Sequence, residues 1–186
     1  MMGARGEKSV PALGFLAVCD LPGRGLVGGY LLLNTAGRPL EFHCTAPVKP
    51  SRAQEILYGP TLEPFLYGEQ IGRALVEKPA ATPLAVFTDH PAVLAAQAFV
   101  AAPLAVVVTA DHHALAAARF HRFEFNGCSL AMPVDKETDA ATLLERLSAS
   151  GVSLDLAEPF ERIREAVREA HRDASTRQTG PTAEAA

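Results

Sequence analysis

Residues 14–45 read GFLAVCDLPGRGLVGGYLLLNTAGRPLEFHCT, and this stretch decides the fold. It contains three runs of strand-forming residues, at 14–20, 28–34 and 39–45, separated by short segments that contain Gly, Pro or Asn. Segments of that composition make turns, and apolar runs that lie between turns are typical of strands. Three strands joined in order by short turns predict an antiparallel meander.

Alternating helix and strand signals follow the meander. Ser51 and Gln54 have the spacing of a capping box, which predicts that a helix begins at Ser51. A second helical piece is expected from Thr61 to about Lys78. Two apolar runs, at residues 83–89 and 103–109, predict buried strands, and the Ala-rich segment between them predicts a helix at 91–101.

The C-terminal part of the chain predicts a hairpin and two helices. Asn126–Gly127 separates two strand-like runs, 120–125 and 128–133, and is the strongest short hairpin signal in the chain. A short helix is expected at 114–119. Longer helices are expected at 140–150 and at about 158–172, the last with one apolar face.

These elements predict an α/β fold with a mixed sheet. The N-terminal antiparallel three-stranded meander is followed by β-α-β crossover units, and then by the C-terminal hairpin and helices. We expect one domain over residues 12–173, a flexible tail at 1–11 and a disordered tail at 174–186, which is small and polar.

The composition is that of a folded protein. Hydrophobic residues make up 48% and charged residues 20% of the 186 positions, and the formal net charge is −4. An acidic balance argues against a broad nucleic-acid-binding surface. The three cysteines form no CxxC pair and no secretory signal is evident, which favours a cytoplasmic location. We expect no membrane span, because Gln97 and Pro103 interrupt the longest apolar segment.

Four acids lie where a site is expected. In open sheets with crossover helices, sites gather outside the carboxyl ends of strands. One acid follows the first strand, one lies early in the first helix and two follow later strands: Asp20, Glu55, Asp89 and Asp111. Three nearby bases would help a phosphate-bearing substrate to approach: Arg24, Lys49 and Arg52.

The order strand, strand, strand, helix, strand, helix, strand, together with three motifs, resembles the ribonuclease H-like superfamily. FLAVCDLPGRGLVGGYLLL resembles the first strand of that family with its aspartate, SRAQEIL its helix start with a catalytic glutamate, and PLAVFTDHPAVL its fourth strand. The resemblance covers roughly residues 14–109. It implies a nuclease or phosphodiesterase that acts on nucleic acid, in which Asp20, Glu55 and Asp89 hold Mg²⁺ or Mn²⁺ and Asp111 assists.

Other interpretations of the same residues remain open. Aspartates at turns and helix starts are ordinary caps, and a glutamate in a first helical turn suits the helix dipole. The main alternative is therefore a non-catalytic interaction or scaffold module with the same fold, which binds a protein partner as a subunit of a larger assembly.

Two minor alternatives concern histidine and cysteine. Cys44 beside His43 suggests a thiol enzyme, but neighbours in a strand point to opposite faces. Residues 111–113, Asp-His-His, resemble a signature of another phosphoesterase family, although a helix start capped by Asp111 is favoured. The spacing of the cysteines does not indicate a zinc site.

Overall fold

The computed structural model describes residues 11–109, 115 and 119–178. Most of the expected N-terminal tail, Asp111 and nearly all of the expected short helix at 114–119 therefore lie outside the described residues.

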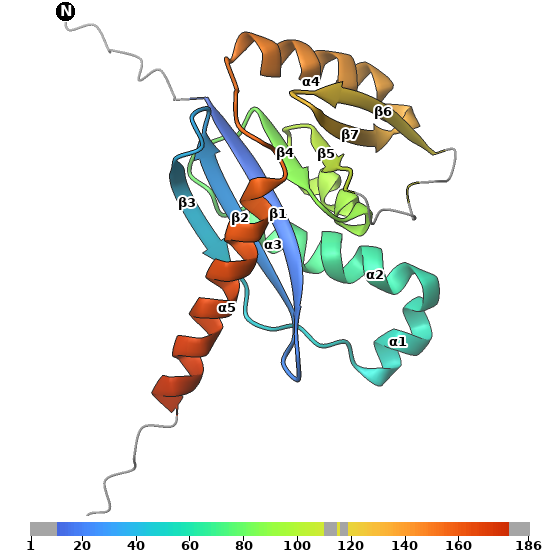
Figure 1. Ribbon diagram of the computed structural model, residues 1–186. Coiled ribbons are helices and arrows are strands. Elements are labelled where there is room, and N and C mark those ends of the chain that lie inside the picture. The colour runs from blue at the N-terminus through green and yellow to red at the C-terminus, as the bar shows by residue number, and fades with distance from the viewer. Residues whose placement is uncertain (1–10, 110–114, 116–118, 179–186) are drawn as a thin grey trace, which may run out of the picture.

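Within these residues the chain forms a mixed sheet of seven strands in the order β3-β2-β1-β4-β5-β7-β6 (Figure 1). β1 pairs antiparallel with β2, and β2 pairs antiparallel with β3, which confirms the meander. β4 joins β1 in parallel and β5 joins β4 in parallel, so the carboxyl ends of these three strands lie at one edge. The strands are β1 (Ala12–Leu21), β2 (Gly25–Asn34), β3 (Pro39–Cys44), β4 (Ala85–Thr88), β5 (Leu104–Val107), β6 (Phe120–Phe125) and β7 (Cys128–Pro133).

The expected α/β class is confirmed, and so is the hairpin of β6 and β7 around Asn126–Gly127. Both turn residues have positive φ, as a tight hairpin of this kind requires. The helical segments are α1 (Arg52–Tyr58), η1 (Gly59–Thr61), α2 (Leu62–Pro64), η2 (Phe65–Gly72), α3 (Arg73–Val76), η3 (Pro91–Phe99), η5 (Val134–Lys136), α4 (Glu137–Ala149) and α5 (Glu158–Gln178).

The capping box predicted at Ser51 is present. The Ser51 hydroxyl oxygen accepts a hydrogen bond from the Gln54 backbone N–H at 3.2 Å, and the Gln54 side-chain oxygen accepts one from the Ser51 N–H at 2.9 Å. Two N–H groups that the first turn cannot satisfy are bonded in this way, so α1 begins where the sequence indicates.

Three helical segments differ from the expected ones. The piece expected at 61–78 is a series of short segments, of which η2 is a π-helix. The helix expected at 91–101 is the 3₁₀-helix η3. The last helix continues to Gln178, so residues 174–178, expected within a disordered tail, are helical.

Helices cover both faces of the sheet (Figure 1). On one face, α4 and α5 pack on β1, β4, β5 and β7. On the other face, η2, α3 and η3 pack on β1, β2 and β4. No helix within the described residues is both long enough and apolar enough to cross a membrane.

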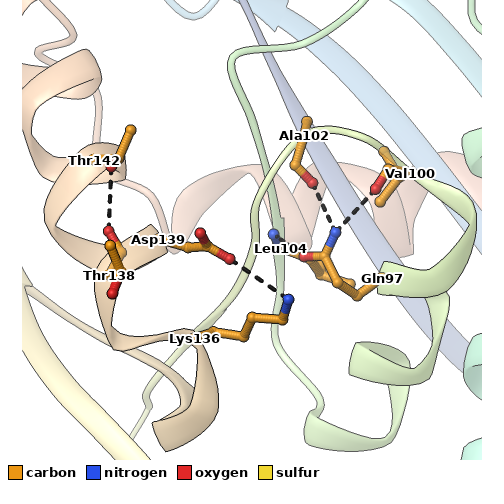
Figure 2. A network of polar contacts seen from close by, with 8 residues as sticks. All are labelled: Gln97, Val100, Ala102, Leu104, Lys136, Thr138, Asp139 and Thr142. Carbon is orange, nitrogen blue, oxygen red and sulfur yellow. Dashed lines mark hydrogen bonds and ion pairs between the residues drawn. The ribbon is translucent and has the colours of Figure 1, made fainter.

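The loop that joins η3 to β5 is held by one side chain (Figure 2). The Gln97 amide donates to the carbonyls of Val100 and Ala102 at 2.9 and 3.1 Å and accepts from the Leu104 N–H at 2.7 Å. Because the amide bonds three backbone groups at once, it sets where β5 begins beside β4.

Candidate functional site

A cleft of about 690 Å³ lies at the carboxyl ends of β1 and β4, beside the N-terminal end of α5. This is the edge at which sites gather in sheets of this kind. Its lining is rich in charged and polar side chains, and consists of Val18, Tyr67, Asp89, His90, Pro91, Thr109, Asp155, Ala157, Glu158, Phe160, Glu161 and Arg164.

Asp89 lies in this cleft and forms an ion pair with Arg164. The Arg164 guanidinium donates through Nη2 to the Asp89 carboxylate and through Nη1 to Glu161 at 2.5 Å. The Asp89 side chain is only 12% exposed, whereas the Arg164 side chain is 31% exposed. The carboxylate at the end of β4 thus serves to connect β4 with α5.

Asp20 lies on the other face of the sheet from Asp89. Side chains alternate along a strand, and Val18 packs in the core beneath η2 and η3, whereas Cys19 packs in the core beneath α5. Asp20 therefore follows the direction of Val18. Asp89 follows the direction of Phe87, which is buried beneath α5. The two aspartates approach the same edge from opposite sides.

Tyr67 lines the cleft, and the charges of these acids act on its hydroxyl. Its pKa is raised, first because burial removes water from the hydroxyl, and then because Glu63, Asp20 and Asp89 contribute negative charge. The residue belongs to the π-helix η2, and π-helical turns are frequent at functional sites. Tyr67 therefore brings a phenol to the cleft and keeps it protonated.

The His90 ring packs against Tyr67 with ring centroids 4.7 Å apart. Its Nδ1 accepts a hydrogen bond from the Ala92 N–H at 3.2 Å, which requires the proton on Nε2. Nε2 lies 3.6 Å from a carboxylate oxygen of Glu63. Both ring nitrogens thus face groups of the protein. Through Nδ1 the His90 side chain caps the start of η3, and the ring forms part of the cleft wall.

Glu55 is not among the residues that line the cleft. Its side chain is 41% exposed on α1 and accepts a hydrogen bond from Arg52 at 2.8 Å. Glu63, which belongs to α2, is the glutamate that lies near His90. Asp111 lies outside the described residues.

The three expected substrate-binding bases lie apart from the cleft. Arg24 donates to the His171 carbonyl at 2.7 Å, and Lys49 donates to the Gly23 carbonyl at 2.6 Å, so both hold the turn between β1 and β2. Arg52 pairs with Glu55 on α1.

The cysteines are separate from one another. His43 pairs with Glu41 at 3.0 Å, on the face of β3 opposite to Cys44, as strand alternation predicts. Burial raises the pKa of the Cys19 thiol, although the charge of Arg164 opposes that effect. A protonated, half-buried thiol is a poor nucleophile.

The residues present fit a divalent-metal centre poorly. Hard cations take several carboxylate or carbonyl oxygens, but the Asp89 carboxylate is bound by Arg164 and Asp20 does not line the cleft. Within the part of the chain that the structure describes, no group of three or more His, Cys, Asp or Glu side chains is placed to hold an ion.

Reasoning from the sequence missed Glu63, Tyr67 and Arg164 as site residues. The spacing of Glu161 and Arg164 correctly predicts a charge pair on α5. That spacing does not indicate that Arg164 also contacts Asp89 at the end of β4. The histidine that follows Asp89 in the sequence was the one available signal for a second polar group at this edge.

No known protein-family model matches this chain, and a search of curated proteins finds no match to it.

Proposed function

We propose that this protein is a non-catalytic interaction module that binds a protein partner through α1. The observation that carries the proposal is that α1 buries none of its own residues and exposes two large apolar ones. Ile56 is 66% exposed and Leu57 is 81% exposed.

An isolated helix of seven residues is marginal in water, and most helices in proteins gain stability by packing an apolar face on the core. α1 does the opposite, because its residues Ile56 and Leu57 are exposed. Ile56 and Leu57 are consecutive, so their side chains lie about 100° apart around the helix axis. We call these two exposed side chains the apolar ridge. A protein partner with an apolar groove would bury this ridge, as in other helix-in-groove complexes.

The ridge is held in place before any partner binds. The capping box fixes the start of α1, and at its last residue the Tyr58 ring stacks on Phe65 with centroids 4.2 Å apart. Binding by an ordered helix avoids part of the entropy cost of association. The internal ion pair of Asp89 and Arg164 agrees with a non-catalytic role, because it occupies the carboxylate that the nuclease hypothesis requires.

The test uses a photo-crosslinking residue in place of Leu57 in the full chain, expressed in cells. The captured protein is identified, purified and titrated against the unmodified chain and Leu57→Ser. We expect Leu57→Ser to weaken binding by about tenfold or more, since fully burying a leucine side chain is worth about 1.5–3 kcal/mol and about 1.4 kcal/mol corresponds to tenfold.

Val134→Ser is the matched control, because Val134 is also exposed and lies on η5, away from α1. It should leave the dissociation constant unchanged, and both variants should keep the melting temperature of the parent. A partner that binds Leu57→Ser as tightly as the parent would contradict the proposal.

A second candidate is the metal-dependent phosphodiesterase with a ribonuclease H-like core. It is favoured by the strand order β3-β2-β1-β4-β5 and by the position of Asp89 in a cleft at the carboxyl end of β4. In this function Asp89 would supply a carboxylate at the end of β4, whereas Asp20 and Glu55 do not line the cleft.

Cleavage assays distinguish the two candidates. Labelled RNA–DNA hybrid, duplex and single-stranded substrates are incubated with Mg²⁺ or Mn²⁺ and the parent or Asp89→Asn, with folding checked by circular dichroism. Metal-dependent cleavage that Asp89→Asn abolishes would establish the phosphodiesterase. Cleavage equal in both proteins, or none in either, would reject Asp89 as a catalytic residue.

A further inference from the structure

A second concavity, separate from the cleft, lies between the β1–β2 turn and the C-terminal half of α5. Its volume is about 230 Å³. It is lined by Leu21, Pro22, Arg24, Arg168, His171 and Arg172.

The described residues that line it carry three guanidinium groups and one imidazole. This is unusual in a chain whose net charge is −4. Gathering like charges around one hollow costs free energy unless a negative charge offsets it. One offset is on the rim, where Arg172 pairs with Glu169 at 3.2 Å, although both side chains are well exposed.

Rigid elements hold these arginines. The side chains of Phe160, Ile163 and Val167 fix α5 on the sheet, all buried to 2% exposure or less. Gly29 of β2 allows the close approach, since a Cβ there would lie 2.4 Å from the Ile163 side chain. Arg168 and Arg172 are four residues apart and lie on one side of the helix, about 6 Å apart along its axis.

The opposite wall is also fixed in place. The Arg24 Nη1 donates to the His171 carbonyl at 2.7 Å, which holds this guanidinium beside α5. Lys49 holds the turn that carries Arg24, because its ammonium donates to the Gly23 carbonyl. Within the described residues Arg168 forms no hydrogen bond or ion pair, and it lines the hollow.

We propose that this concavity is a binding site for a phosphate group, held by Arg24, Arg168 and Arg172. Guanidinium groups bind phosphate through paired N–H donors, and arginine is favoured wherever such planar recognition matters. The volume suits one phosphate group and is below the usual range for sites that enclose a whole drug-sized ligand. The phosphate comes either from the free ion or from a phosphomonoester whose organic part stays outside.

Isothermal titration of the full chain tests this proposal, with inorganic phosphate, a nucleoside monophosphate and the matching nucleoside as probes. We expect saturable binding of phosphate or of the monophosphate. Arg168→Gln should weaken it by about tenfold or more, because one charge-assisted contact is lost. Arg24→Gln should weaken it similarly.

Arg146→Gln is the matched control, since it removes the same charge from an exposed position on α4. It should leave the affinity unchanged. Equal affinity for phosphate and monophosphate would identify the free ion, and tighter binding of the monophosphate would identify the ester. The proposal is overturned by no saturation up to about 10 mM, by equal losses in Arg146→Gln and Arg168→Gln, or by a nucleoside that binds as tightly as its monophosphate.

Discussion

Single side chains decide several local structures in this protein, and Gln97 is the clearest case. Its amide is the hydrogen-bond partner of three backbone groups in the η3–β5 loop. We expect Gln97→Ala to lower the free energy of unfolding by about 2 kcal/mol, because half-buried backbone groups lose their partners. Urea denaturation measures the change.

Thr142→Ala serves as the control in the same region (Figure 2). Thr142 is exposed on α4 and its hydroxyl donates only to the Thr138 carbonyl, at 3.2 Å. Its removal should change stability by no more than about 0.5 kcal/mol. If Gln97→Ala is equally mild, water replaces the amide and the loop does not depend on it.

Glu41 gives β3 a pH-dependent contact. The hydrogen bond from His43 lowers the pKa of this carboxyl below its ordinary value of 4.5, against burial, which raises it. The folded state therefore favours the ionised form. The resulting stabilisation is present above the unfolded-state pKa and is lost as the pH falls through the folded-state pKa.

Unfolding by urea at about pH 6 and about pH 3 tests this contact. Glu41→Gln should be less stable than the parent at the higher pH, and the difference should shrink at the lower pH. Glu145→Gln, at an exposed position of α4, should show no such pH-dependent difference. A gap between Glu41→Gln and the parent that is unchanged at low pH would show that the ionised carboxyl is not what stabilises β3.

At the scale of elements, the contact between η2 and η3 depends on glycine. A Cβ added to Gly68 would lie 2.5 Å from the Ala95 Cβ and 2.8 Å from the Ala96 backbone nitrogen. We expect Gly68→Ala to lower stability by about 1–3 kcal/mol through overpacking, although alanine is the better helix former. Thermal unfolding measures the loss.

The second variant is Gly68→Ala combined with Ala95→Gly. It should recover part of the stability, because it removes the Cβ clash but leaves the contact with the Ala96 backbone. A Gly68→Ala protein that is as stable as the parent would show that η2 and η3 separate without cost.

At the scale of the whole molecule, the ion pair of Asp89 and Arg164 joins the sheet to α5 across 75 positions of sequence. We expect Arg164→Met and Asp89→Asn each to destabilise by about 1–2 kcal/mol, a value reduced by the partial exposure of Arg164. The double variant should lose clearly less than the sum of the two, which a double-mutant cycle in urea measures.

Lys136→Met is the control for this cycle, because Lys136 pairs with Asp139 at 3.7 Å on an exposed surface. It should change stability by no more than about 0.5 kcal/mol. Additive losses at Asp89 and Arg164 would mean that the two side chains act independently.

Local patterns in the sequence were enough to predict the elements that depend on near neighbours. Apolar runs between turns predict the meander, Asn126–Gly127 predicts the hairpin, and Ser51 with Gln54 predicts the start of α1. Each of these structures is stabilised by contacts within a few residues, so a short sequence pattern is enough to predict it.

Tertiary contacts decided the rest, because no short pattern encodes them. The π-helical and 3₁₀ geometry of η2 and η3 accompanies a close approach between segments nearly thirty residues apart. The faces of Asp20 and Asp89 depend on strand register, in which a shift of one residue reverses every side chain. The partner of Asp89 and the neighbours of Arg24 come from α5, at the far end of the chain, and only the packing of that helix on the sheet brings them together.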